Sequence, residues 1–179
     1  VLSRGLGDVY KRQVENNDDI KKLEISSPEV AYVTQTTLSV GETRELINSL
    51  KEKFPGIIGP SADDICYATQ NRQDAVKQLS LECQIVLVIG SQTSSNSNRL
   101  KELAEKCGTK SFLIDDKTDI DLNSLKDATS VGITAGASAP EEIVQEVISF
   151  LFPLGFKTVR NLSENNENMT FKLPKELTS

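Results

Sequence analysis

The sequence contains no histidine. This absence removes the commonest metal ligand and general base of proteins, and with it any Ser-His-Asp triad. Cysteine is scarce too, because only Cys66, Cys83 and Cys107 occur, widely spaced and without a CxxC pair. They predict neither a disulfide framework nor a self-contained zinc site. Any chemistry must therefore come from hydroxyls, carboxylates, thiolates or a cofactor.

Basic residues are also in deficit, with 20 Lys and Arg against 26 Asp and Glu and a formal net charge of −6. No basic stripe offsets this charge, so we expect no nucleic-acid partner. No apolar run approaches the roughly 18–20 residues of a membrane span. The opening VLSRGLGDVYKRQ lacks the apolar centre of a secretory signal. We therefore expect a protein of the cytosol that does not enter membranes.

Short apolar runs alternate with helical patterns from Ile20 onward. This alternation is typical of the α/β class, with mostly parallel sheets and flanking helices. Residues 84–90, QIVLVIG, form an almost unbroken apolar run, which predicts a central strand buried on both faces. Further strands are expected at 30–34, 111–115 and 131–134.

A helix is expected after the strands at 30–34, 84–90 and 131–134, and another over about residues 70–79. The polar tail contains a short strand-like segment, MTFKL, at 169–173. Ser39 and Glu42 have the spacing of a capping box, and Pro55-Gly56 should end the first helix. Gly108 should end a later one. The expected apolar faces are Leu46, Ile47 and Leu50; Leu100, Leu103 and Ala104; and Ile143, Val144, Val147, Ile148 and Leu151.

Small hydroxyl and amide side chains stand where these helices are expected to begin. A helix start offers unpaired N–H groups and the positive end of the dipole, which favour an anion such as phosphate. In a parallel sheet these turns gather at the carboxyl ends of the strands, where ligands bind. Each residue alone is better explained as an ordinary N-cap than as a ligand contact. The residues are Thr36 and Thr37; Thr69; Ser94, Ser95 and Asn96; and Ser138, which has capping-box spacing to Glu141.

The segment SQTSSNS, residues 91–97, holds more hydroxyl and amide groups than one helix cap requires. The excess leaves side chains for a ligand. Neither G-x-x-x-x-G-K-[ST] nor G-x-G-x-x-G occurs in the sequence, so this is not a standard nucleotide loop.

The cysteines differ in their surroundings. Cys66 lies in DDICYATQ, just before an expected helix, where the dipole favours the thiolate that binds metal. A structural role for Cys66 is equally open on position alone. Cys83 and Cys107 are predicted to be small buried hydrophobes. A single thiolate cannot hold an iron–sulfur cluster.

Five segments in this order resemble the second half of the LytB/IspH family, and the resemblance covers Ile20 to Ser179. The segments are VTQTTLSV, DDICYATQNRQ, SSNSNRL, VGITAGASAP and PKEL. The resemblance implies three α/β domains around an iron–sulfur cluster. It also implies reductive removal of the allylic hydroxyl of 4-hydroxy-3-methylbut-2-enyl diphosphate. The products are isopentenyl and dimethylallyl diphosphates of the methylerythritol phosphate pathway of isoprenoid biosynthesis.

The same resemblance assigns roles to residues of this sequence. Cys66 is similar to one of three cysteines that hold a 4Fe–4S cluster. The implied electron donor is a ferredoxin or flavodoxin, and the implied location is the bacterial cytoplasm or the plastid stroma. The residues that match substrate-binding positions of the family are Thr36, Ser94, Ser95, Asn96 and Ser138.

The family's other two cluster cysteines, its substrate-contacting histidines and its proton-delivering glutamate belong to the N-terminal half and are not found here. Cys83 and Cys107 do not occupy cluster positions. We therefore interpret the chain as a C-terminal fragment that has no reductase activity alone. Its expected parts are a non-native tail at 1–13, the end of a second domain at 14–60, a third domain at 61–153, and a tail at 154–179 that packs back on the enzyme. A stand-alone phosphate-binding module without redox activity, and a structural remnant, are the alternatives.

Overall fold

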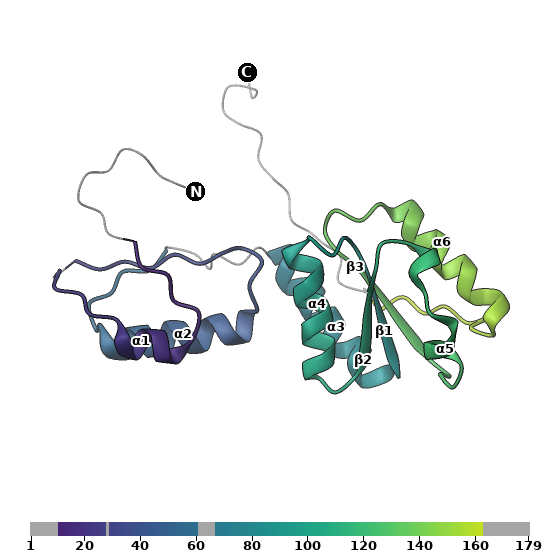
Figure 1. Cartoon of the computed structure of the whole chain (residues 1–179), viewed down its shortest axis with the longest axis horizontal. Coiled ribbons are helices and arrows are strands. Elements are labelled where there is room, and N and C mark those ends of the chain that lie inside the picture. Colours follow the sequence, from purple (N-terminus) through teal and green to yellow (C-terminus); the bar gives the residue numbers. More distant parts are fainter. Residues whose placement is uncertain (1–10, 28, 61–66, 163–179) are drawn as a thin grey trace, which may run out of the picture. The chain divides into compact units, whose positions relative to one another are not determined.

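The computed structural model of the chain describes residues 11–27, 29–60 and 67–162, and Figure 1 shows the helices and strands that they form. The chain divides into two compact units, Val1–Asn71 and Arg72–Ser179. None of the described helices is long and apolar enough to cross a membrane.

The first unit contains the helices α1 (Asn17–Lys22) and α2 (Val40–Lys53). The sequence patterns did not predict α1, which begins with a capping box between Asn16 and Asp19. Lys53, the last residue of α2, donates from Nζ to two backbone carbonyls of α1, both at 2.7 Å. These bonds hold α1 against the end of α2.

The strand predicted at 30–34 is reduced to one isolated parallel bridge between Ala31 and Ile58. The Tyr32 N–H donates to the Ile58 carbonyl at 2.9 Å. A strand needs a continuous row of backbone partners. Residues 30–34 form a single bridge and no ladder, so the prediction of a full strand is wrong.

The helix α2 begins directly after Ser39 and ends before Pro55-Gly56, as predicted. The predicted capping box with Glu42 is wrong, because the Ser39 side chain makes no capping hydrogen bond. The Thr43 N–H donates instead to the backbone carbonyl of Ser39, at 3.0 Å. The first turn of α2 is therefore held by a backbone hydrogen bond and not by the Ser39 side chain.

The second unit is built on a three-stranded parallel sheet of β1 (Ile85–Ile89), β2 (Lys110–Ile114) and β3 (Val131–Ala135), in the order β2-β1-β3. Every residue of β1 is buried. The prediction of a central strand covered on both faces is confirmed. Four helices and two 3-10 helices surround the sheet: α3 (Tyr67–Glu82), α4 (Ser95–Lys106), η1 (Lys117–Asp119), α5 (Leu122–Leu125), α6 (Glu141–Leu151) and η2 (Phe152–Leu154).

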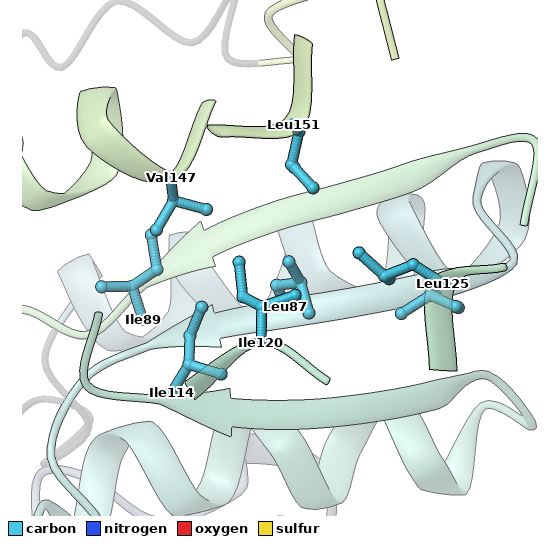
Figure 2. Packing of buried hydrophobic residues seen from close by; sticks show 8 residues of the cluster. Leu87, Ile89, Ile114, Ile120, Leu125, Val147 and Leu151 are labelled. Carbon is cyan, nitrogen blue, oxygen red and sulfur yellow. The ribbon is translucent and has the colours of Figure 1, made fainter. Parts of the chain in front are cut away.

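Side chains of β1 alternate between two hydrophobic cores because successive strand residues point to opposite faces. Figure 1 shows α3 and α4 on one side of the sheet and α5 and α6 on the other. One core is formed by Val76, Val86, Val88, Leu100 and Ala104. The other, seen in Figure 2, is formed by Ile85, Leu87, Ile89, Ile114, Ile120, Leu125, Val147 and Leu151.

The strands β2 and β3 and the helices α4 and α6 follow the predictions, whereas α5, η1 and η2 were not predicted. The helix α4 ends at Lys106, and Gly108 follows with a φ of 85°. Leu100 and Ala104 on α4, and Val147 and Leu151 on α6, are buried. The helix α3 runs to Glu82, farther than predicted. The strand-like MTFKL at 169–173 lies outside the described residues.

The connections divide at the carboxyl ends of β1 and β3. The chain leaves the carboxyl end of β1 toward α4, on one face, and leaves the carboxyl end of β3 toward α6, on the other. Neighbouring parallel strands whose connections diverge in this way form a topological switch point, the usual place for a ligand in open α/β sheets.

Candidate functional site

The loop after β1 is held together by its own side chains. The hydroxyls of Ser91 and Thr93 share a hydrogen bond of 2.9 Å. Asn98, one turn into α4, donates from Nδ2 to the carbonyls of Gln92 at 2.7 Å and Ser94 at 2.9 Å. Part of the polar excess predicted to serve a ligand therefore shapes the loop.

Ser94 is the N-cap of α4, and Ser95 is the first helical residue. The Ser94 Oγ accepts the Ser97 N–H at 3.3 Å and the Ser97 hydroxyl at 3.1 Å. Ser95 is exposed beside it. Both serines thus stand at the start of the helix, as the sequence predicted.

The side chain of Ser97 packs the start of α4 against the ends of β1 and β3. Its side chain is completely buried. A Cβ atom added to Gly90, directly after β1, would lie 2.3 Å from the Ser97 Oγ, and one added to Gly136, directly after β3, would also lie at 2.3 Å. Only glycine at both positions lets the hydroxyl fit between these backbones.

Sequence reasoning missed this arrangement. It counted Ser97 as one more hydroxyl of the loop and gave Gly90 and Gly136 no part in the site. The available signal was a glycine at the end of two parallel strands together with a small residue in the first turn of the following helix.

Asn96 carries a buried amide in the first turn of α4. Its side chain is only 8% exposed, and among the described residues neither Oδ1 nor Nδ2 has a hydrogen-bond partner. An unsatisfied buried polar group costs about 1–3 kcal/mol. The residue lies in the first turn of α4, which contains no acidic side chain. This combination is what a site for an anionic ligand requires.

Ser138 lies in the turn after β3 and is exposed. The helix α6 begins at Glu141 with Pro140 as its N-cap, so the predicted capping box of Ser138 is wrong. Pro140 has an extended ψ of 140°, and a proline disfavours helical geometry in the residue before it. Glu141 and Glu142 fill the first turn of α6.

Thr36 belongs to the first unit, where it is exposed in the turn before α2. Its approach to the serines of the second unit stays a prediction. Thr69, another hydroxyl singled out in the sequence, is buried in the first turn of α3. Its burial agrees with a structural role.

The two loop segments after β1 and β3 carry no basic side chains. SQTSSNS and GASAP contain neither Lys nor Arg. Arg99 lies on α4 and pairs with Glu102 at 2.7 Å. Two open surface hollows have volumes of about 640 and 610 Å³. The second is lined in part by Gln92 of the SQTSSNS loop, by Asn98 and by two lysines, Lys101 and Lys110. The first is lined by three glutamates of α6, which suits no anion.

Cys66 lies outside the described residues. The described residues contain no group of three His, Cys, Asp or Glu side chains able to hold a metal ion, so they do not by themselves form a cluster site. Cys83 is half-buried, and burial raises the pKa of its thiol, as a structural role predicts. Cys107 is exposed at the end of α4, so the prediction that it is buried is wrong.

Comparison with known proteins gives a consistent result. The family described as LytB protein matches residues 5–152. The 4-hydroxy-3-methylbut-2-enyl diphosphate reductase of Saccharophagus degradans is 56% identical over 165 residues, which are 92% of this chain and 53% of that protein. The reductase of the same name from Alcanivorax borkumensis is 52% identical over 172 residues, 96% of this chain and 55% of that protein.

A solved structure agrees with the fold. The E-1-hydroxy-2-methyl-but-2-enyl-4-diphosphate reductase of Plasmodium falciparum superposes with a TM-score of 0.82 at 35% identity, over 91% of this chain and 52% of that one. The prediction of an α/β fold with parallel strands and flanking helices is confirmed. The chain spans about half the length of these relatives.

Proposed function

This chain belongs to the LytB family, and from that premise we propose that it is the C-terminal part of a 4-hydroxy-3-methylbut-2-enyl diphosphate reductase. The intact enzyme would replace the allylic C–O bond of the substrate by C–H, with loss of the hydroxyl. Isopentenyl and dimethylallyl diphosphates would result. The work of this part of the chain would be to hold the diphosphate.

The proposed diphosphate site lies at the switch point of the second unit. Ser94, Ser95 and Asn96 would contact the anion from the start of α4. Ser138 would contact it from the turn after β3. We propose Thr36, in the first unit, as a further substrate-binding residue of the intact enzyme.

The observation that carries this proposal is the unpartnered amide of Asn96. Its Nδ2 and Oδ1 are both buried without partners among the described residues. A diphosphate oxygen that accepted from Nδ2 would remove part of this unfavourable free energy. Part of the free energy of diphosphate binding would then come from giving the buried Asn96 amide a partner.

The site would bind its anion with neutral groups. Hydroxyls, an amide and backbone N–H groups are its donors, because the two loop segments carry no Lys or Arg. Each hydrogen bond from a neutral donor to a charged oxygen contributes about 1.5–3 kcal/mol. The dipole of α4 adds to this attraction because no carboxylate lies in the first turn of the helix.

An amide NMR titration of the 179-residue chain with inorganic diphosphate tests the site. We expect Asn96→Ala to raise Kd about tenfold, which corresponds to 1.4 kcal/mol. Without the ligand, the same variant should unfold at an equal or higher temperature, because a buried unpaired amide has been removed. Asn123→Ala, an exposed asparagine on α5, is the matched control and should leave Kd unchanged. A chain that does not bind diphosphate, or a Kd that Asn96→Ala leaves unaltered, would place the anion elsewhere.

The redox chemistry would depend on residues beyond the described part of the chain. We propose that Cys66 is one of three thiolates that hold a 4Fe–4S cluster in the intact enzyme, and that the cluster supplies the electrons. A ferredoxin or flavodoxin would deliver them, in the bacterial cytoplasm or the plastid stroma. The 179 residues alone would show no reductase activity, since one thiolate cannot hold the cluster.

Cluster absorbance after anaerobic reconstitution of an intact enzyme carrying this sequence distinguishes the cysteines. Cys66→Ser should remove most of the absorbance because it removes a ligand. Cys83→Ser should keep it, because the Cys83 side chain is half-buried and burial raises its thiol pKa. Equal loss in both variants would refute the assignment.

A further inference from the structure

Ser97 makes more contacts with Ser94 than a helix cap needs. A cap is satisfied when the side chain of the first residue accepts a backbone N–H, and Ser94 Oγ does accept the Ser97 N–H at 3.3 Å. The Ser97 hydroxyl adds a second bond to the same oxygen, at 3.1 Å.

The second bond determines whether the Ser94 hydroxyl can donate to a ligand or accept from it. A serine hydroxyl has one proton to donate and two lone pairs to accept with. Both lone pairs of Ser94 are engaged by Ser97. The Ser94 proton is therefore directed away from Ser97, and Ser94 can meet a ligand only as a donor. An anion with acceptor oxygens fits this polarity.

The Ser97 hydroxyl is itself held in place. Ser97 is completely buried, between the backbones of Gly90 and Gly136, where an added Cβ would lie 2.3 Å from its Oγ on either side. The Gly136 N–H donates to the Ile89 carbonyl at 2.8 Å, which joins the ends of β1 and β3. The slot that receives Ser97 is thus formed by the carboxyl ends of β1 and β3.

We propose that Ser97 is a positioning residue that fixes the Ser94 hydroxyl as a hydrogen-bond donor to the bound diphosphate. The inference rests on the diphosphate site proposed above. Ser97 does not touch the ligand and acts through Ser94 alone.

A double-mutant cycle on the full 179-residue chain, with inorganic diphosphate as the probe and amide NMR titration as the measurement, tests this role. We expect Ser97→Ala and Ser94→Ala each to raise Kd about tenfold. The double variant should have the Kd of Ser94→Ala, because Ser97 has no effect once the hydroxyl it orients is gone. If Ser97→Ala does not fold, Ser97→Cys replaces it in the cycle, since a thiol is similar in size but a weak donor.

Ser111→Ala is the matched control for a general loss of stability. Ser111 is a buried serine in β2 whose hydroxyl donates to the Val86 carbonyl at 3.0 Å. This variant should lower the unfolding temperature and leave Kd unchanged.

Two results would overturn the inference and leave the diphosphate site standing. One is an unchanged Kd in Ser97→Ala while Ser94→Ala and Asn96→Ala weaken binding. The other is an equal loss from Ser97→Ala in the presence and absence of Ser94, which would make its role structural. If the unaltered chain does not bind diphosphate, the proposed site and this inference both fail.

Discussion

The helices α4 and α6 begin in similar sequence and in different structure. Both follow the carboxyl end of a parallel strand and a glycine, and both are preceded by serine. At α4 the capping serine accepts two hydrogen bonds and a buried amide lies in the first turn. At α6 the serine is exposed, and a proline is the cap.

Charge separates the two helix starts further. Glu141 and Glu142 occupy the first turn of α6, where they already interact with the positive end of its dipole. The first turn of α4 has no acidic residue. Similar patterns of small residues therefore produce two different helix starts. The start of α4 has donor groups in place and no carboxylate to repel an anion. The start of α6 offers only the Ser138 hydroxyl, from the turn before the helix. We expect α4 to supply most of the binding free energy.

The largest effect should come from removing the α4 groups together. Ser94→Ala combined with Asn96→Ala should weaken diphosphate binding about a hundredfold, since each lost bond is worth about 1.5–3 kcal/mol and 1.4 kcal/mol is tenfold. Ser138→Ala, on the α6 side, should weaken it no more than about tenfold. Calorimetry with inorganic diphosphate measures both. Equal losses of diphosphate affinity in the α4 and α6 variants would contradict the prediction that α4 supplies most of the binding free energy.

A smaller effect, on stability, should separate two glycines. Gly136→Ala places a methyl group 2.3 Å from the Ser97 Oγ, so we expect the free energy of unfolding to fall by about 1–3 kcal/mol. Gly41→Ala, on α2, meets no atom within 4 Å and should raise it by about 0.5 kcal/mol through helix propensity. Urea denaturation followed by circular dichroism measures these changes. A Gly136→Ala variant as stable as the unaltered chain would show that the slot around Ser97 is loose.

The sheet was predictable because its signal is hydrophobic and local. The run at 84–90 could be buried only on both faces, and β1 is the central strand. The segment at 30–34 has a similar β-propensity, yet Val33 is 81% exposed. A strand also depends on partners far along the sequence, and propensity carries no information about them.

The sequence predicted which residue types form the candidate site, but not the contacts between them. Ser94, Ser95 and Asn96 do stand at the start of a helix. Ser138 does not, because Pro140 delays the start of α6. Sequence reasoning could not tell which hydroxyls of residues 91–97 bond one another, since that depends on loop geometry. It also could not foresee that two glycines would make room for Ser97.

The position of β1 has a consequence for synthesis of the chain. Its neighbours in the sheet, β2 and β3, both follow it in sequence. While a ribosome adds residues 90–109, the uncharged segment IVLVI has neither partner available, and β3 is absent until residues 131–135 are added. Short uncharged segments of high β-propensity are prone to pair with other chains. The helix α3 precedes β1 and can cover only the face of Val86 and Val88. The strand that is most protected in the folded protein is thus the one that is longest exposed to aggregation during translation.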